Sequence, residues 1–150
     1  MKTRTAKTIN KNGKPGILIL SHGPLAAGLF DSLEMIVGEQ ENIAAFSYEI
    51  QDELNDFTDR FMEAYKKLPE ETIVMVDIYG GSPCNQFILR SLQDHENILA
   101  LTGVNLPMTL EACSVRGKLH GQELLADIQK HASEGIVNVT EKINERRNAK

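Results

Sequence analysis

Residues 17–29 read ILILSHGPLAAGL and combine two structural periods in one short stretch. The first four residues form an unbroken apolar run, which is typical of a strand buried on both faces of a sheet. The helical stripe that follows continues through Leu33 to Ile36, and Gly38 ends it. This segment therefore predicts a buried strand over 17–20, a tight turn, and a helix over 24–37.

The rest of the chain repeats this alternation of apolar runs and helical stripes. Further strands are expected at 43–48, 72–78, 98–102 and 135–140, and further helices at 54–68, 83–92, 107–115 and 122–132. Strands that alternate with helices predict an α/β fold with a doubly wound, mostly parallel sheet flanked by helices. The last strand, GIVNVT at 135–140, follows a helix and could lie antiparallel at an edge of its own sheet or of a partner's sheet.

Length and charge describe one globular domain with a basic start. The chain has 150 residues, which is an ordinary size for a single domain. Five lysines and arginines and no acidic residue lie in the first sixteen positions, so residues 1–15 are expected to be a basic, disordered leader before one domain at 16–150. The remaining 11 basic and 21 acidic residues give that domain a charge of −10, which argues against a nucleic-acid partner.

The sequence contains neither a membrane-spanning run nor a cysteine motif, which excludes membrane-spanning and disulfide-stabilised proteins. No apolar run approaches the roughly 18 residues that a membrane span needs. The two cysteines, Cys84 and Cys113, lie outside any CxxC pair, and two reduced thiols fit a cytoplasmic protein.

Three expected strands end in similar glycine- and proline-containing turns: SHGP at 21–24, DIYGGSP at 77–83 and TGVNLP at 102–107. Ligands of such sheets bind beyond the carboxyl ends of the strands. Proline near the first helical position places a helix start after each turn, where free N–H groups favour an anion. We therefore expect an anion site at this edge, with His22, Asp77 and Ser82 at the tips of the turns.

His22 and Asp77 close two different strands. If the strands are neighbours, the carboxylate can accept a hydrogen bond from one ring nitrogen, which fixes the tautomer and leaves the other nitrogen with a free lone pair. Such an imidazole can act as a nucleophile or as a general base.

Other chemistries lack their signatures. A hydrolase triad with Ser82 is rejected because Pro83 has no N–H for an oxyanion hole. His95, His120 and His131 have no metal-ligand spacing with one another or with the cysteines, so no metal is expected. Neither G-x-G-x-x-G nor a P-loop occurs, so no nucleotide cofactor is expected. An anion site that contains a histidine but no nucleotide motif is most simply explained by a histidine that itself carries a phosphoryl group.

Four stretches carry a resemblance to a known family, in the family's order: ILILSHGPLAAGL, EMIVGEQENI, VDIYGGSP and GVNLPM. Over about residues 16–140 the sequence resembles the enzyme IIA domains of the mannose-type sugar phosphotransferase system. The resemblance implies that His22 is phosphorylated on Nε2, that Asp77 orients its Nδ1, and that Gly23, Gly81 and Ser82 surround the phosphoryl group.

The resemblance also implies partners. The donor would be the phosphocarrier protein HPr, and the acceptor would be the cognate enzyme IIB, which feeds sugar import through the membrane components IIC and IID. The family fold forms a homodimer by exchanging a C-terminal antiparallel strand, for which GIVNVT is the candidate. The transfer needs no cofactor in principle.

Three alternatives stay open at this point. The first is the phosphocarrier subunit of a dihydroxyacetone kinase system, which shares the fold and the phosphohistidine. The second is a regulatory module whose phosphorylation reports sugar supply. The third is a non-catalytic anion-binding protein.

Overall fold

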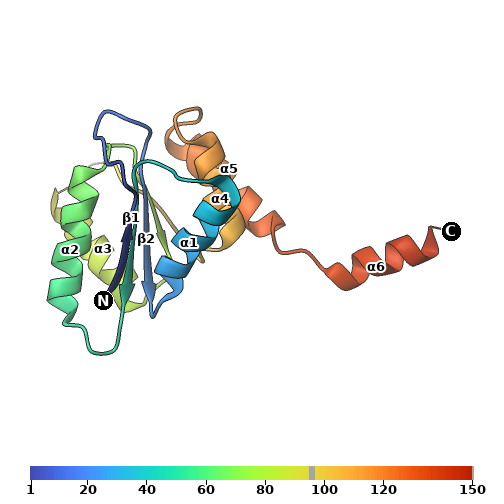
Figure 1. Ribbon diagram of the computed structural model, residues 1–150, viewed down its shortest axis with the longest axis horizontal. Helices are drawn as coiled ribbons and strands as arrows, with labels where there is room; N and C mark the ends of the chain where they lie inside the picture. The colour runs from blue at the N-terminus through green and yellow to red at the C-terminus, as the bar shows by residue number, and fades with distance from the viewer. Residues whose placement is uncertain (95–96, 150) are drawn as a thin grey trace.

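The computed structural model describes residues 1–94 and 97–149, and it is an α/β domain with a helical extension at its C-terminus (Figure 1). The strands of the described residues are β1 (Lys2–Thr5), β2 (Ile17–His22), β3 (Ile43–Tyr48), β4 (Ile73–Val76) and β5 (Leu99–Thr102). The helices are α1 (Leu25–Val37), α2 (Leu54–Lys67), α3 (Ser82–Asp94), α4 (Leu106–Val115), α5 (Gly121–Glu134) and α6 (Val139–Asn148).

The strands form one sheet in the order β1-β3-β2-β4-β5. The four strands from β3 to β5 are parallel, and β1 is antiparallel to β3. Ile17 of β2 lies opposite Ile43 of β3 and Ile73 of β4, so the three central strands begin level with one another. The prediction of an α/β fold with a mostly parallel sheet is confirmed.

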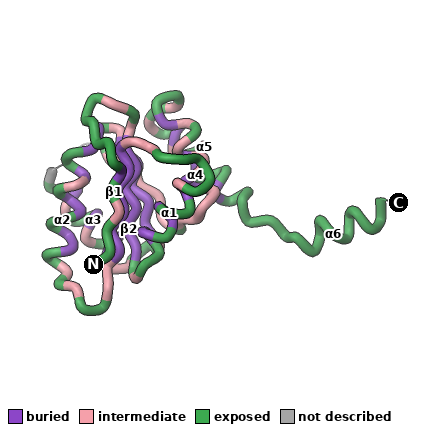
Figure 2. The backbone as a smooth tube through the Cα atoms, in the orientation of Figure 1, coloured by how far each residue is buried: buried purple, intermediate pink, exposed green. Residues whose placement is uncertain are grey.

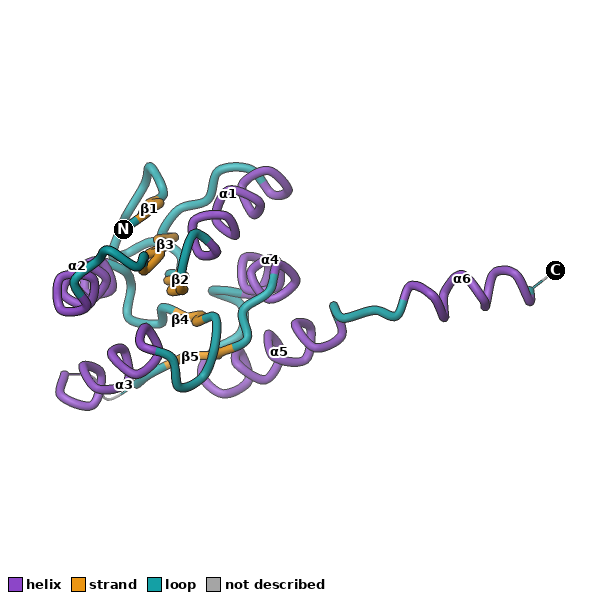
Figure 3. Tube along the Cα trace, turned by 90° about the horizontal axis from the view of Figure 1, so that it is seen from below, coloured by secondary structure: helices purple, strands orange, loops and turns teal. Residues whose placement is uncertain are grey.

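Alternate side chains of β2 enter two separate cores, one on each face of the sheet. Ile17 and Ile19 pack with residues of α1, α4 and α5, whereas Leu18 and Leu20 pack with residues of α2 and α3. Figure 2 shows the central strands as the buried part of the molecule, and Figure 3 shows the helices on both sides of them. Each such side chain contributes about 1.5–3 kcal/mol on burial, which explains the unbroken apolar run.

The expectation of a disordered leader at residues 1–15 is wrong, because Lys2–Thr5 form the edge strand β1. Thr3 lies opposite Phe46, and the Arg4 guanidinium donates to Asp31 on α1 at 2.9 Å. Further along, the main-chain N–H of Asn10 donates to the Asn42 side chain at 2.7 Å. An edge strand hydrogen-bonds on one side only, so charged and threonine side chains suffice and no apolar run marks it.

The predicted strand at 135–140 is also absent from this chain. Helix α5 ends at Glu134, and α6 begins at Val139 after a short loop. The Asn138 side chain caps α6 by accepting a hydrogen bond from the main-chain N–H of Glu141 at 3.1 Å. Helix α6 buries no residue and extends away from the domain (Figure 2). Of this segment only Val139 and Thr140 are helical, and residues 135–138 form the loop that joins α5 to α6.

None of the helices in the described ranges combines the length and the apolar character that a membrane span requires.

Candidate active site

His22 is the last residue of β2, at the carboxyl edge of the parallel strands. The five preceding residues of the strand are buried, whereas the His22 side chain is 47% exposed. A buried strand therefore holds an imidazole that solvent and partners can reach.

Asp77 follows β4, the neighbour of β2, and its carboxylate binds His22 twice. The same oxygen, Oδ2, accepts from the main-chain N–H of His22 at 2.8 Å and lies 2.8 Å from the ring Nδ1. The other oxygen accepts from the main-chain N–H of Ile78 at 2.8 Å. A carboxylate can only accept, so Nδ1 carries the proton and Nε2 keeps its lone pair. The Asp77 side chain is only 11% exposed, so this contact is largely shielded.

Gly81 lies against the Cε1–Nε2 edge of the ring. A Cβ built on Gly81 would fall 2.6 Å from His22 Cε1 and 3.3 Å from Nε2. Glycine is required here because the loop backbone approaches the imidazole more closely than a methyl group allows. The imidazole is thus held between the Asp77 carboxylate and the loop that leads into α3.

Two N–H groups in the first turn of α1 already have internal acceptors. Those of Ala26 and Ala27 donate to the hydroxyls of the buried Ser21 and Ser47, at 2.7 and 3.2 Å. The main-chain N–H of Gly23 donates to the Tyr48 carbonyl oxygen at 2.7 Å. Although Gly23 lies beside His22 as predicted, its N–H is not free for a phosphoryl group in this structure.

The other two predicted turns differ in what they offer. Ser82 is the first residue of α3 and directly follows Gly81, the residue that lies against the ring, so this helix begins close to His22. At the third turn, Gly103 donates to the Asp77 carbonyl oxygen at 3.1 Å, and Asn105 caps α4 by accepting from Met108 at 2.9 Å. That turn is therefore hydrogen-bonded to the main chain of Asp77.

A hollow of about 480 Å³ beside His22 is lined by residues that the motifs did not indicate. Besides His22 and Gly23 it includes Tyr48, Glu49, Ile50 and Gln51, which belong to the end of β3 and the loop after it. The Tyr48 and His22 rings are 6.5 Å apart and meet edge to face. The signal that could have found these residues is strand order, because β3 lies next to β2 and its carboxyl end must border the same site.

The remaining histidines lie elsewhere. His120 Nδ1 is 2.8 Å from Glu71 Oε2, and His131 contacts carboxylates of α4 and α5. His95 lies outside the described residues.

Together the fold and the site define a doubly wound α/β domain built around one oriented histidine. Residues 16–129 match the family model EIIA-man, described as "PTS system fructose IIA component", where PTS is the sugar phosphotransferase system. The chain belongs to this family and is an EIIA phosphocarrier component of a sugar phosphotransferase system.

Individual relatives agree with that assignment. The PTS system fructose-specific EIIA component of Bacillus subtilis is 32% identical over 115 residues, which is 75% of this chain and 78% of that protein. The mannose-specific EIIAB component of Escherichia coli K12 is 31% identical over 67% of this chain, which spans only 31% of that longer protein. The EIIA crystal structure from Streptococcus agalactiae has a TM-score of 0.76 at 29% identity, over 84% of this chain and 98% of that one.

Replacement of Gly81 by alanine tests the close approach to the ring. The methyl group would displace the imidazole, and a misplacement of about 1 Å can slow transfer by about 10²-fold. The φ angle of Gly81 is not in the left-handed region, so the fold should survive. The control is Gly28→Ala on α1, where a Cβ meets nothing within 4 Å. Equal phosphorylation rates for the two variants in rapid-quench assays would contradict the role of Gly81.

Replacement of Asp77 by asparagine tests the orientation of the ring. The amide oxygen can still accept from the main-chain N–H of Ile78, so the fold should persist, although the hydrogen bond from the main-chain N–H of His22 is lost. The amide NH2 then donates to Nδ1, which imposes the wrong tautomer, and the neutral amide cannot offset imidazolium charge. The phosphorylation rate should fall, by up to about 10⁴-fold on the serine-protease precedent. Asp59→Asn, which changes an exposed carboxylate paired with Arg90, is the matched control. A wild-type rate for Asp77→Asn would remove this residue from the mechanism.

Proposed function

We propose that His22 is the residue that carries the phosphoryl group, on Nε2, between the phosphocarrier protein HPr and an enzyme IIB. The observation that supports this most directly is the 2.8 Å contact between His22 Nδ1 and the shielded Asp77 carboxylate. It directs the lone pair of Nε2 away from Asp77, on a side chain that is about half exposed.

The transfer then proceeds in two balanced steps. The lone pair of Nε2 attacks the phosphorus of the donor phosphohistidine, the N–P bond of the donor breaks, and its electron pair returns to the donor ring. The reverse sequence passes the group to IIB. Phosphoryl transfer depends mainly on in-line placement and charge stabilisation, and Asp77 offsets the positive charge that forms on the His22 ring.

For charge stabilisation on the phosphoryl group, we assign the start of α3. Ser82 offers its N–H and its hydroxyl there, and the positive end of the helix dipole adds to them. Gly81 allows the ring to approach this helix start. The first turn of α1 contributes less than the sequence suggested, because its N–H groups are bound to Ser21 and Ser47.

The partners follow from the phosphotransferase system. HPr and IIB would dock in turn over His22, with the loop at 49–51 beside it as part of the contact surface. Membrane components IIC and IID would complete sugar import, and this chain would act in the cytoplasm.

We also propose that the chain forms a homodimer by exchanging residues 135–140. Strand β5 is at one edge of the sheet, and Ile136, Val137 and Val139 are exposed large apolar side chains. Beside β5 an apolar groove of about 590 Å³ is lined by residues that include Phe87, Ile98 and Leu101. Pairing with β5 of a second copy would cover both the apolar segment and the open edge.

The phosphorylation site can be identified directly. Phospho-HPr should label wild-type protein on His22 alone, and the adduct should be acid-labile and alkali-stable because it is a phosphoramidate. His22→Ala should lose labelling with little change in stability, and His120→Ala should label normally. Mass spectrometry at neutral to alkaline pH provides the measurement. A phosphoryl group on Ser82, or full labelling of His22→Ala, would overturn the assignment.

Two truncations test the strand exchange. Removal of residues 136–150 leaves α5 intact and should convert a dimer into a monomer or a precipitate. Removal of residues 141–150 disrupts α6 but keeps 135–140, so it should leave the dimer intact. Sedimentation equilibrium measures both. A monomeric full-length chain, or a dimer that survives the longer truncation, would contradict the exchange.

A further inference from the structure

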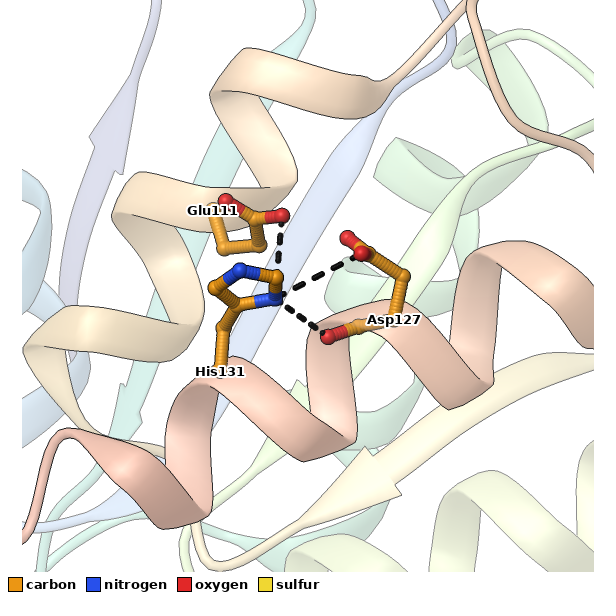
Figure 4. Close-up of side chains that lie close together, drawn as sticks. All are labelled: Glu111, Asp127 and His131. Atoms are coloured by element: carbon orange, nitrogen blue, oxygen red, sulfur yellow. Dashed lines mark hydrogen bonds and ion pairs between the residues drawn. The ribbon is translucent and has the colours of Figure 1, made fainter.

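Helices α4 and α5 bring three metal-ligating side chains together on the face where they meet. Glu111 comes from α4, and Asp127 and His131 are one turn apart on α5 (Figure 4). Their side chains are 17%, 25% and 45% exposed. The sequence analysis missed this group because it compared the histidines only with one another and with the cysteines. Glu111 is also distant in sequence and comes close only when the two helices pack.

The spacing of the three groups fits a small metal ion. His131 Nδ1 is 3.2 Å from Glu111 Oε2 and 3.4 Å from Asp127 Oδ1. Ligands about 2.0–2.1 Å from a tetrahedral Zn²⁺ are separated by roughly 3.3–3.4 Å. One ligand atom from each residue lies within 4.8 Å of the other two, so all three can reach one ion after small side-chain adjustments.

A second observation concerns Asp127 Oδ2. This oxygen has less than 1 Å² of exposed surface and no hydrogen-bond partner. A buried acceptor without a partner is unfavourable, and here it belongs to a carboxylate that faces another carboxylate. Burial, and then the hydrogen-bonding contact and the charge of the neighbouring Asp127, raise the pKa of Glu111, whereas the charge of His131 lowers it. Within the described ranges, the ion pairs of both acids run to His131, so the cluster has little positive charge to balance it.

We propose that Glu111, Asp127 and His131 bind one divalent transition-metal ion, with Zn²⁺ as the best fit. Imidazole and carboxylate together suit zinc, whereas Mg²⁺ and Ca²⁺ take oxygen ligands. Nδ1 lies 2.9 Å from the main-chain carbonyl oxygen of Asp127. The metal binds the Nδ1 lone pair: in a neutral ring the Nδ1 proton moves through solvent to Nε2, and a ring protonated on both nitrogens releases its Nδ1 proton to solvent and keeps the one on Nε2. Water supplies the fourth ligand.

The bound ion would fasten α5 to α4. Helix α5 ends three residues after His131, at Glu134, and leads into the segment that we propose is exchanged. The site shares no residue with the His22 site, so metal binding and phosphoryl transfer can be tested separately.

The test is a Zn²⁺ titration of chelator-treated, untagged protein by calorimetry at pH 8. We expect one Zn²⁺ per chain with a dissociation constant in the micromolar range or below, and a higher melting temperature with the ion. His131→Gln and Glu111→Gln should each weaken binding at least tenfold, since loss of even outer-shell partners costs about 10–100-fold. The matched control is His120→Gln, which removes another histidine paired with a glutamate and should bind normally.

Nitrogen NMR of the histidine rings can be measured on the wild-type protein, so it does not depend on how well a variant folds. Zn²⁺ should shift the His131 Nδ1 resonance and leave the His120 resonances unchanged. Circular dichroism checks that each variant is folded. The proposal is overturned if binding does not saturate below about a millimolar, if it survives in both cluster variants, or if Mg²⁺ binds as tightly. In that case Glu111, Asp127 and His131 would form only an ionic contact, in which protonated His131 is the cation.

Discussion

The site depends on one carboxylate oxygen. Asp77 Oδ2 accepts from both the main-chain N–H and the ring of His22, so a single atom fixes where β2 ends and how its last side chain points. This requires β2 and β4 to finish level with each other, and the parallel register that places Leu20 opposite Val76 ensures it. A slip of one residue would turn His22 to the other face of the sheet. The two apolar cores that hold the register therefore also position the imidazole.

At this edge of the sheet, the N–H groups at the starts of α1 and α3 differ in their hydrogen bonding. Ser21 and Ser47 are fully buried in neighbouring strands, and their hydroxyls accept from the first turn of α1. This stabilises the helix start without an external anion. At α3 the chain instead places glycine against the ring and serine at the first helical position. The imidazole thus has a carboxylate at Nδ1 and the residue before a helix start near Cε1 and Nε2, an arrangement suited to the proposed roles of a proton at Nδ1 and a phosphoryl group at Nε2.

The sequence predicted the central strands and the helices that cover them, because strands buried on both faces require long apolar runs. It also predicted that His22, Asp77 and Ser82 lie at one edge, because the strand ends meet there; the contact between His22 and Asp77 agrees with this. It could not identify β1, since the exposed residues of an edge strand carry no apolar pattern. It misassigned 135–140, where the described chain has a loop at 135–138 and the start of α6 at Val139, because a short run of apolar residues does not distinguish a strand from an exposed loop and helix start. Predicting the role of Tyr48 required the order of the strands, and predicting the Glu111 cluster required the packing of α4 on α5. No local motif contains this information.

The two edge strands of the sheet, β1 and β5, differ in how they are covered, and this difference affects where a second copy of the chain could pair. Strand β1 covers the edge of β3, and the contact between Arg4 and Asp31 fastens it to α1. Its outward edge has lysine and arginine, which discourage pairing with another strand. Strand β5 has no such cover among the described residues, and apolar Leu99 and Leu101 lie along it. Residues 2–5 lie outside the segment that matches the family model. Any strand added by a second copy is thereby directed to β5, where exposed residues 136–139 of the same sequence provide an apolar match.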